Sequence, residues 1–197
     1  MESTSAPALA DPTSFGLDSP ARNKALLETL RKKPSKLLAR IGLGTGEKLS
    51  LLKSGAGNGS IYAEYNGYIA LHIQYHQYRY SFLPITSVTQ TKLWRSEALP
   101  VTNSFSQSLF FRIMLNVSDA MLSDKEHTPD GIDFWKRRAR EAMQKNLNVA
   151  LVDFGNKTYH RFTDKMELEA SLTDSWGGGM NKTRYQQMRW LIWRNSK

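Results

Sequence analysis

Two runs of alternating apolar residues on either side of an Asn-Gly pair constrain the fold of this chain most strongly. The runs read SIYAEY and YIALHIQY, and Asn66-Gly67 lies between them. Asn-Gly favours a two-residue turn with positive φ at both positions, which suits a pair of antiparallel strands. The residues expected to share a face are Ile61, Ala63 and Tyr65 on one strand and Ile69, Leu71 and Ile73 on the other. The pattern therefore predicts a β-hairpin over residues 60–82.

The N-terminal segment predicts a tail and two helices ahead of this hairpin. Residues 1–18 are rich in Ser, Pro, Ala and Thr and lack apolar periodicity, so a disordered tail is expected there. A helix then begins with Ser19 as its cap and Pro20 in its first turn, and Pro34 ends it. A second, short helix is expected over residues 35–41, followed by a glycine-rich linker.

Six further elements are predicted after the hairpin. Asp130 is placed to cap a basic helix, and Asp164 with Glu167 forms a capping-box pattern at the start of a later one. In chain order the elements are helices over 108–122 and 132–146, strands over 149–154 and 158–162, a helix over 165–172 and a strand over 188–194. The sequence thus predicts an α+β fold, a single domain over residues 19–197 with a hairpin-rich antiparallel or mixed sheet and surface helices.

The composition excludes several classes of protein. The chain has no Cys, which excludes disulfides, thiol catalysis and cysteine-ligated zinc and fits a reducing compartment. No apolar run reaches the roughly 18–20 residues of a transmembrane helix. The N-terminus lacks the basic and apolar regions of a secretory signal peptide, so a cytoplasmic protein is expected. The tail is interpreted as a plain extension; as a signal for a bacterial export machine it would make the protein a secreted effector.

The charge of the chain indicates an anionic partner. The chain has 27 Lys and Arg against 18 Asp and Glu, a net charge of +9. Three acids and no base lie in the first twenty residues, so the remainder carries 27 − 15, or +12. Such a charge attracts nucleic acid, anionic lipid or an acidic protein surface. The candidate nucleic-acid-binding residues, all from the helix over 132–146, are Trp135, Lys136, Arg137, Arg138, Arg140 and Lys145. Arg forks suit phosphate and Trp suits base stacking, whereas a solvated helix face is the alternative interpretation.

The best candidate for catalysis is an acidic loop ahead of this helix. It contains Asp124, Glu126, His127 and Asp130. Carboxylates beside a histidine could hold Mg²⁺ and activate water, as nucleases do, so a metal-dependent nuclease or phosphodiesterase is an alternative function. A solvated loop with helix caps is the favoured interpretation. No metal site is therefore assigned, and no cofactor is expected unless this loop holds Mg²⁺.

Three other motifs do not support a chemical function. Asp153 in VALVDFG resembles the metal-binding corner of a protein kinase, but no catalytic-loop His-Arg-Asp precedes it. Asp153 is therefore expected to be structural, at the end of a buried strand. The glycines ahead of Lys48 lack the spacing of a phosphate loop. His72 and His76 would lie about 13 Å apart along a strand, too far to share a metal ion.

The second half of the chain resembles proteins of mobile genetic elements. DGIDFWKRRAREAMQKNLNVALVDF, residues 130–154, is similar to the helix-then-strand step of the ParB/sulfiredoxin-like proteins, with Phe134 where the ParB motif has Arg. The wider pattern, over about residues 118–194, resembles the oncogenic-suppression and fertility-inhibition proteins, which block conjugative transfer by a rival element. The resemblance implies a bacterial plasmid or prophage accessory protein that interferes with DNA transfer by binding nucleic acid or the conjugative transfer machinery.

Overall fold

The chain forms an α+β fold with a mixed sheet, as predicted from the sequence. This computed structural model describes residues 16–55, 58–85, 87–102, 104–123, 129–176 and 187–194, without the side chains of residues 116, 129, 130 and 174–176. The described chain divides into two compact units. The N-terminal unit comprises the described residues up to Gln77 together with Thr91–Asn116, and the C-terminal unit comprises Tyr78–Gln90 and the residues from Val117 onward.

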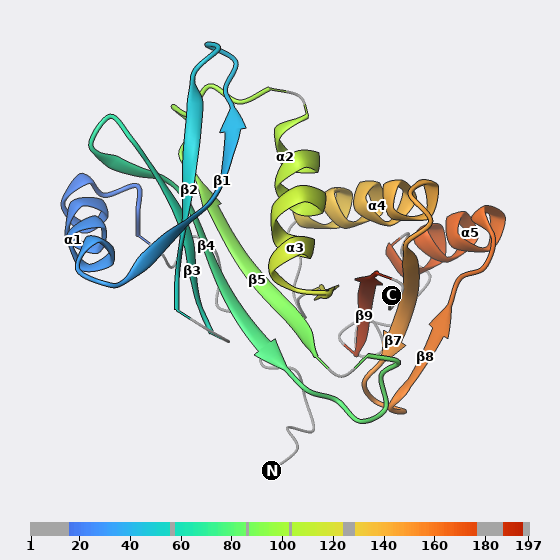
Figure 1. The fold of residues 1–197 in the computed structure, drawn as a ribbon. Coiled ribbons are helices and arrows are strands. Elements are labelled where there is room, and N and C mark those ends of the chain that lie inside the picture. The colour runs from blue at the N-terminus through green and yellow to red at the C-terminus, as the bar shows by residue number, and fades with distance from the viewer. Residues whose placement is uncertain are drawn as a thin grey trace. The chain divides into compact units, whose positions relative to one another are not determined.

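The N-terminal unit is a sheet with helices on both sides. Its elements are α1 (Pro20–Arg31), β1 (Ser35–Gly42), β2 (Lys48–Ser54), β3 (Gly59–Tyr65), β4 (Tyr68–Tyr78), β5 (Val88–Arg95), α2 (Phe105–Ser108), the π-helical η2 (Leu109–Met114) and α3 (Leu115–Val117). The strands are hydrogen-bonded in the order β1-β2-β3-β4-β5. Figure 1 shows α1 on one side of this sheet and α2 and η2 on the other. In this order β1 is an edge strand, paired with β2 alone.

The hairpin predicted around Asn66-Gly67 is confirmed. β3 and β4 are antiparallel, and φ is 53° at Asn66 and 78° at Gly67. Ile61 pairs with Ile73 across the strands, and all the apolar residues of the predicted face except Tyr65 are buried. Alternating apolar residues with an Asn-Gly turn therefore fixed the register of this strand pair, apart from one irregularity after Ala63.

The first helix is confirmed, and its apolar stripe packs on β3 and β4. Leu27 and Leu30 of α1 lie in a buried cluster with Tyr62 and Ile69. Leu17 belongs to the same cluster and is only 3% exposed, so the predicted boundary of the tail at residue 18 is wrong. An apolar residue just ahead of a helix often packs against the first turns of that helix, and this contact fixes the angle at which the chain enters it. The rest of the predicted tail, residues 1–15, lies outside the described residues.

The short helix predicted over residues 35–41 is wrong, because this segment is β1. A helix of that length is barely stable alone, whereas pairing with β2 satisfies the backbone groups on one side of the strand. The glycine-rich linker is the turn of this second hairpin. Gly46 has φ +86°, and the Gly44 N–H donates to the carbonyl of Pro100 at 2.7 Å. A Cβ at Gly44 would lie 3.3 Å from that oxygen, so a small residue suits the position.

The C-terminal unit contains the remaining strands of the mixed sheet and two helices. Its further elements are β6 (Ala120–Leu122), α4 (Pro129–Gln144), β7 (Asn148–Asp153), β8 (Thr158–Arg161), α5 (Lys165–Trp176) and β9 (Met188–Trp193). The first residues of β5 begin the order β5-β6-β9-β7-β8, in which β5 and β6 are parallel and the other pairs antiparallel. Figure 1 shows α4 and α5 side by side, and both helices are in contact.

Most of the elements predicted for the C-terminal half are confirmed. The strand β7 is buried, with Val149 and Val152 fully covered. Asp164 caps α5, since its Oδ1 accepts from the N–H groups of Met166 and Glu167 at 2.7 and 3.0 Å. Glu167 does not complete the box in this structure, because its carboxylate contacts His160 instead.

Two predictions for the C-terminal half are wrong, and the strand β5 has no counterpart among the predicted elements. The helix expected over residues 108–122 ends at Val117, and Ala120–Leu122 form β6, because they pair with β9 and β5. Asp130 lies inside α4, which begins at Pro129, so it is not the residue before the helix. β5 was not predicted at all, since VTQTKLWR alternates too weakly to indicate a strand.

Among the described residues, no helix is long and apolar enough to cross a membrane.

Candidate nucleic-acid interface

The basic helix predicted to contact nucleic acid is α4, and one of its faces is buried. Trp135 and Arg138 are 8% and 3% exposed, and Ala139 and Ala142 are fully buried. α4 packs on β7, β9 and α5. The indole of Trp135 packs edge to face on Phe134, with ring centres 6.0 Å apart. Trp135 is therefore held in the core of its unit, which does not suit stacking on a base.

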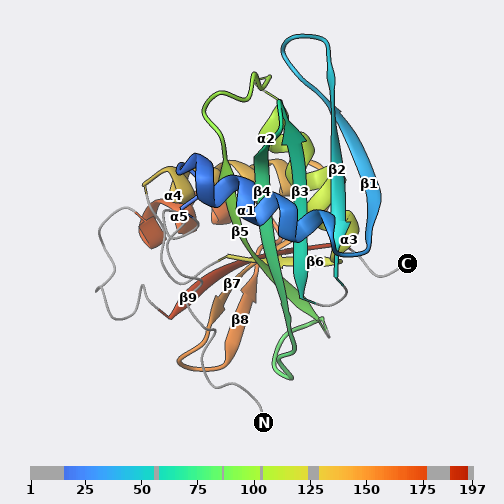
Figure 2. The ribbon, with the colours of Figure 1, turned by 90° about the vertical axis from the view of Figure 1, so that its left-hand side faces the viewer.

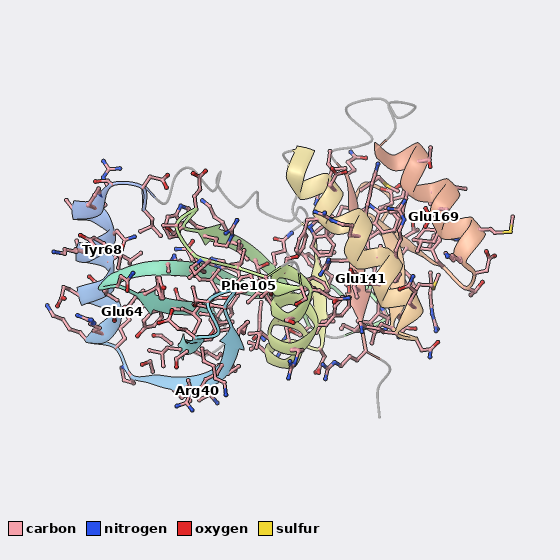
Figure 3. All side chains as sticks on the ribbon, turned by 90° about the horizontal axis from the view of Figure 1, so that it is seen from above. Arg40, Glu64, Tyr68, Phe105, Glu141 and Glu169 are labelled. Carbon is pink, nitrogen blue, oxygen red and sulfur yellow. The ribbon has the colours of Figure 1, made fainter. Side chains whose placement is uncertain are left out.

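Two arginines of α4 are bound to glutamates. Arg138 Nη2 donates to Glu141 Oε1 at 3.1 Å, and burial lowers the pKa of Arg138 although Glu141 opposes the shift. Arg140 donates from Nε and Nη2 to the two carboxylate oxygens of Glu169 on α5, each at 2.7 Å, and this hydrogen bonding raises the pKa of Arg140. Figure 3 labels the two glutamates, one on each helix. Both guanidinium groups thus have carboxylate partners within the unit.

The other cations of this helical segment are more accessible. Arg137 and Lys145 are exposed, and Lys136 is partly exposed. Lys145 follows the last residue of α4. Binding of nucleic acid by α4 stays a prediction, and in this structure these three residues are the ones placed to carry it.

The acidic loop predicted as a catalytic site falls almost wholly outside the described residues. Asp124, Glu126 and His127 are not described, and neither is the side chain of Asp130. The nuclease hypothesis therefore stays a prediction. Within the described ranges, no three His, Asp or Glu side chains lie close enough together to hold a metal ion.

Asp153 and His72 both have structural contacts. Asp153 Oδ1 accepts from the N–H groups of Gly155 and Asn156 at 2.9 and 3.0 Å, and Oδ2 accepts from Asn156 Nδ2 at 2.8 Å. These hydrogen bonds hold the β7–β8 turn. His72 is buried, its Nε2 lies 3.1 Å from Ser60 Oγ, and burial lowers its pKa to about 4.

A second group of cations lies on the β1–β2 hairpin and the residues leading into it. We call this group the basic ribbon; it consists of Lys32, Lys33, Lys36, Arg40, Lys48 and Lys53. Five of the six side chains are exposed, and Lys53 is half-buried. Within the described chain, none of them forms an ion pair with a carboxylate. Figure 3 shows the Arg40 side chain pointing outward from β1. The basic ribbon therefore presents uncompensated positive charge along an edge strand.

Two lysines of the basic ribbon face each other across the strands. Lys36 on β1 and Lys53 on β2 are direct partners in the register. The Lys53 ammonium lies 5.3 Å from the centre of the Tyr75 ring. Burial lowers the pKa of Lys53, and the charge of Lys36 lowers it further. Like charges in directly opposite positions destabilise a strand pair, so this arrangement costs free energy in the unliganded protein.

The sequence held one signal for this group. No acidic residue lies between Glu28 and Glu47, whereas five basic residues do. The pairing of Lys36 with Lys53 follows only from the β1–β2 register, which a helix over residues 35–41 would not produce.

No known family model, curated protein or solved structure matches the chain. What the chain binds is therefore inferred from the geometry of its charged groups.

Proposed function

We propose that this protein binds nucleic acid through the phosphate backbone, along the basic ribbon, without selecting a sequence. The observation that carries the proposal is the Lys36–Lys53 pair, in which two lysines occupy directly opposite positions of the β1–β2 register with no carboxylate partner in the described chain. A phosphate between them turns a repulsion into two attractions. The expected cost of the unliganded pair is about 0.2–1 kcal/mol, which a single charged hydrogen bond exceeds.

The dimensions of the hairpin suit a backbone contact. An eight-residue strand such as β1 is about 26 Å long, a length over which one strand of duplex DNA carries roughly eight phosphates. Lysine binds phosphate as a point charge, which tolerates small changes in register. The strands SKLLARIG and KLSLLKS contain no aromatic, Asn or Gln side chain, the types used for stacking and for reading adenine. Contacts along this hairpin are therefore directed to phosphates, which carry no sequence information.

The resemblance of residues 118–194 to fertility-inhibition proteins suggests a biological role for such binding. A protein that covers nucleic acid, or the part of the transfer machinery that handles it, would interfere with conjugative transfer. Expression in a donor cell is expected to lower the frequency of plasmid transfer, and neutralising the basic ribbon is expected to restore it. A transfer frequency that is unchanged by the parent protein would remove this role and leave the binding proposal standing.

Affinity for a labelled duplex of about 20 base pairs tests the binding proposal. At 100 mM salt a dissociation constant of about 10⁻⁴–10⁻⁶ M is expected, the range of sequence-independent binding. The double variant Lys36→Gln with Lys53→Gln should bind about tenfold more weakly, because two phosphate contacts are lost. The matched control is Arg137→Gln with Lys145→Gln, which removes two exposed charges at α4 and should bind like the parent.

Competition by a second polymer distinguishes a nucleic-acid partner from an acidic protein partner. Polyglutamate matched in charge to the duplex should compete poorly, since flexible carboxylates do not present phosphates at a fixed spacing. Equal competition by polyglutamate would assign the basic ribbon to an acidic protein partner. If the α4 control, and not the ribbon variant, lost affinity for DNA tenfold, the interface would be assigned to α4.

A further inference from the structure

A pocket in the N-terminal unit lies between the start of α1, the β3–β4 turn and the segment after β5. Its volume is about 370 Å³, which is within the range of small-molecule sites. All of its described lining residues belong to this one unit. Figure 2 shows α1 crossing in front of β3 and β4, the strands whose connecting turn contributes to the pocket. The pocket is therefore built by the fold of a single unit.

The lining of the pocket combines aromatic rings with carboxylates. Tyr65, Tyr68 and Trp94 supply the rings, and Asp18 and Glu97 supply the carboxylates. No Lys or Arg is among the described lining residues. The described residues of the unit include twelve basic and five acidic residues, a net charge of +7. The pocket thus has the opposite charge to the unit that contains it.

Neither carboxylate is neutralised by a base within the described chain. Asp18 Oδ1 accepts a hydrogen bond from Trp94 Nε1 at 3.3 Å, and neither Asp18 nor Glu97 forms an ion pair there. The rings can also attract a cation. The Lys24 ammonium, which does not line the pocket, already lies 5.6 Å from the centre of the Tyr68 ring. Tyr68 is labelled beside α1 in Figure 3.

The lining at Asn23 is fixed by hydrogen bonds that use both protons of its side-chain amide, so it offers no donor to a ligand. The buried Asn23 donates from Nδ2 to the carbonyls of Leu17 and Ile69 at 3.2 and 3.0 Å. Its Oδ1 accepts from the N–H of Ile69 at 2.7 Å. These bonds tie α1 to β4, so the pocket is formed before any ligand enters. Selectivity must therefore come from the rings, the carboxylates and the apolar side chains of Leu17 and Leu99.

We infer that this pocket binds an aliphatic diamine, a short methylene chain with an ammonium group at each end. The two carboxylates match the two positive charges, and the rings add cation–π attraction. The methylene chain contacts the apolar side chains. A monoamine would leave one carboxylate without a partner, so the diamine is expected to bind more tightly. This site is separate from the basic ribbon and does not depend on the proposed function.

Calorimetric titration of the full chain with 1,4-diaminobutane at 150 mM salt tests this inference. Saturable binding at one site is expected. Glu97→Gln and Asp18→Asn should each weaken binding about tenfold, which corresponds to roughly 1.4 kcal/mol. The matched control is Glu28→Gln, which removes an exposed carboxylate of the same unit outside the pocket and should leave the affinity unchanged. Circular dichroism of each variant checks that the fold is retained.

Two other ligands define the chemistry of the site. n-Butylamine should bind at least fivefold more weakly than the diamine, and 1,4-butanediol should not bind. Equal affinity for n-butylamine would contradict the role of the second carboxylate. Tighter binding of a lysine-containing peptide than of the diamine would overturn the inference in favour of a protein side chain. No saturable binding of any amine, or an equal loss in Glu28→Gln, would also overturn it.

Discussion

The basic ribbon and α4 both carry a run of cations, but in the described chain only α4 has cations in ion pairs with carboxylates. On α4, Arg138 is bound to Glu141 and Arg140 to Glu169. On the basic ribbon, no described residue pairs with a carboxylate. A dense run of basic residues in a sequence therefore does not identify the surface that meets a polyanion. What matters is whether the fold brings acids to those bases.

The difference follows from the neighbours of each element. α4 packs on β7 and β9 and lies beside α5, so part of its surface must be buried and another part faces a helix that supplies Glu169. β1 is an edge strand, and its single strand neighbour contributes Lys48 and Lys53, not acids. Lysines on an edge strand also prevent pairing with other chains. Substitutions in these two environments are therefore expected to differ in the size and the sign of their effects.

Removing Arg138 should have the largest effect on stability. The Arg138 side chain is almost fully buried, and Arg138→Ala leaves the partly buried Glu141 without its partner. Loss of one member of a buried pair costs about 3–5 kcal/mol. Urea denaturation should show that loss in the free energy of unfolding. A change below about 1 kcal/mol would mean that the pair is solvated, and the contrast with the basic ribbon would weaken.

His72 should make the N-terminal unit sensitive to acid in a way that the ribbon cations do not. Burial lowers its pKa from 6.5 to about 4, so between these values the unfolded chain binds a proton that the folded chain does not. This contribution to stability is complete above pH 6.5 and is lost as the pH falls to about 4. It should amount to about 2–3 kcal/mol between pH 7 and pH 4.5.

His72→Gln removes this group and leaves the carboxylates that also titrate in acid. The loss of unfolding free energy between pH 7 and pH 4.5 should therefore be smaller in the variant by about 2–3 kcal/mol. Identical pH dependence in the two proteins would show that the pKa of His72 is not lowered in the folded state.

Breaking the Arg140–Glu169 pair should have a modest effect. The two side chains are 41% and 37% exposed, so solvent screens their attraction, and Arg140→Ala should cost up to about 1 kcal/mol. Affinity for DNA should not change, because this guanidinium already has a carboxylate partner. A severalfold loss of DNA affinity with this variant would show that the pair opens to bind phosphate.

Neutralising Lys36 should have the smallest effect and the opposite sign. Lys36→Gln relieves the repulsion on Lys53 and leaves the contact between Lys53 and Tyr75 in place. The free energy of unfolding should rise by about 0.5 kcal/mol at low salt. Lys33→Gln, an exposed lysine ahead of β1, is the matched control and should have no effect. A loss of stability in Lys36→Gln would contradict the repulsive interpretation of the pair.

The sequence predicted the parts of the fold that depend on local signals. The Asn66-Gly67 turn, the buried strand around Val149 and the cap at Asp164 are each determined by a few neighbouring residues, and each is confirmed. β1 was missed because SKLLARIG has a helical spacing of apolar residues, and only pairing with β2 makes it a strand. Tertiary pairing of this kind overrides local propensity.

The site was harder to predict than the fold. The basic run of the sequence predicts Trp135 and Arg138 at the interface, but their burial depends on how α4 packs. The opposition of Lys36 and Lys53 joins residues 17 positions apart in the chain, and the pocket gathers Asp18, Trp94 and Glu97 from distant segments. No periodicity in the sequence links such residues, so these features required the structure.

The salt dependence of DNA binding tests the central claim most directly. The slope of log K against log salt is about 0.9 per phosphate contact, so a basic ribbon that uses five or six cations predicts a slope of about −5 for the parent protein. Lys36→Gln with Lys53→Gln should reduce its magnitude by about two units, and Arg137→Gln with Lys145→Gln should leave it unchanged. An unchanged slope in the ribbon variant, together with a reduced slope in the α4 variant, would contradict the claim that the basic ribbon is the interface.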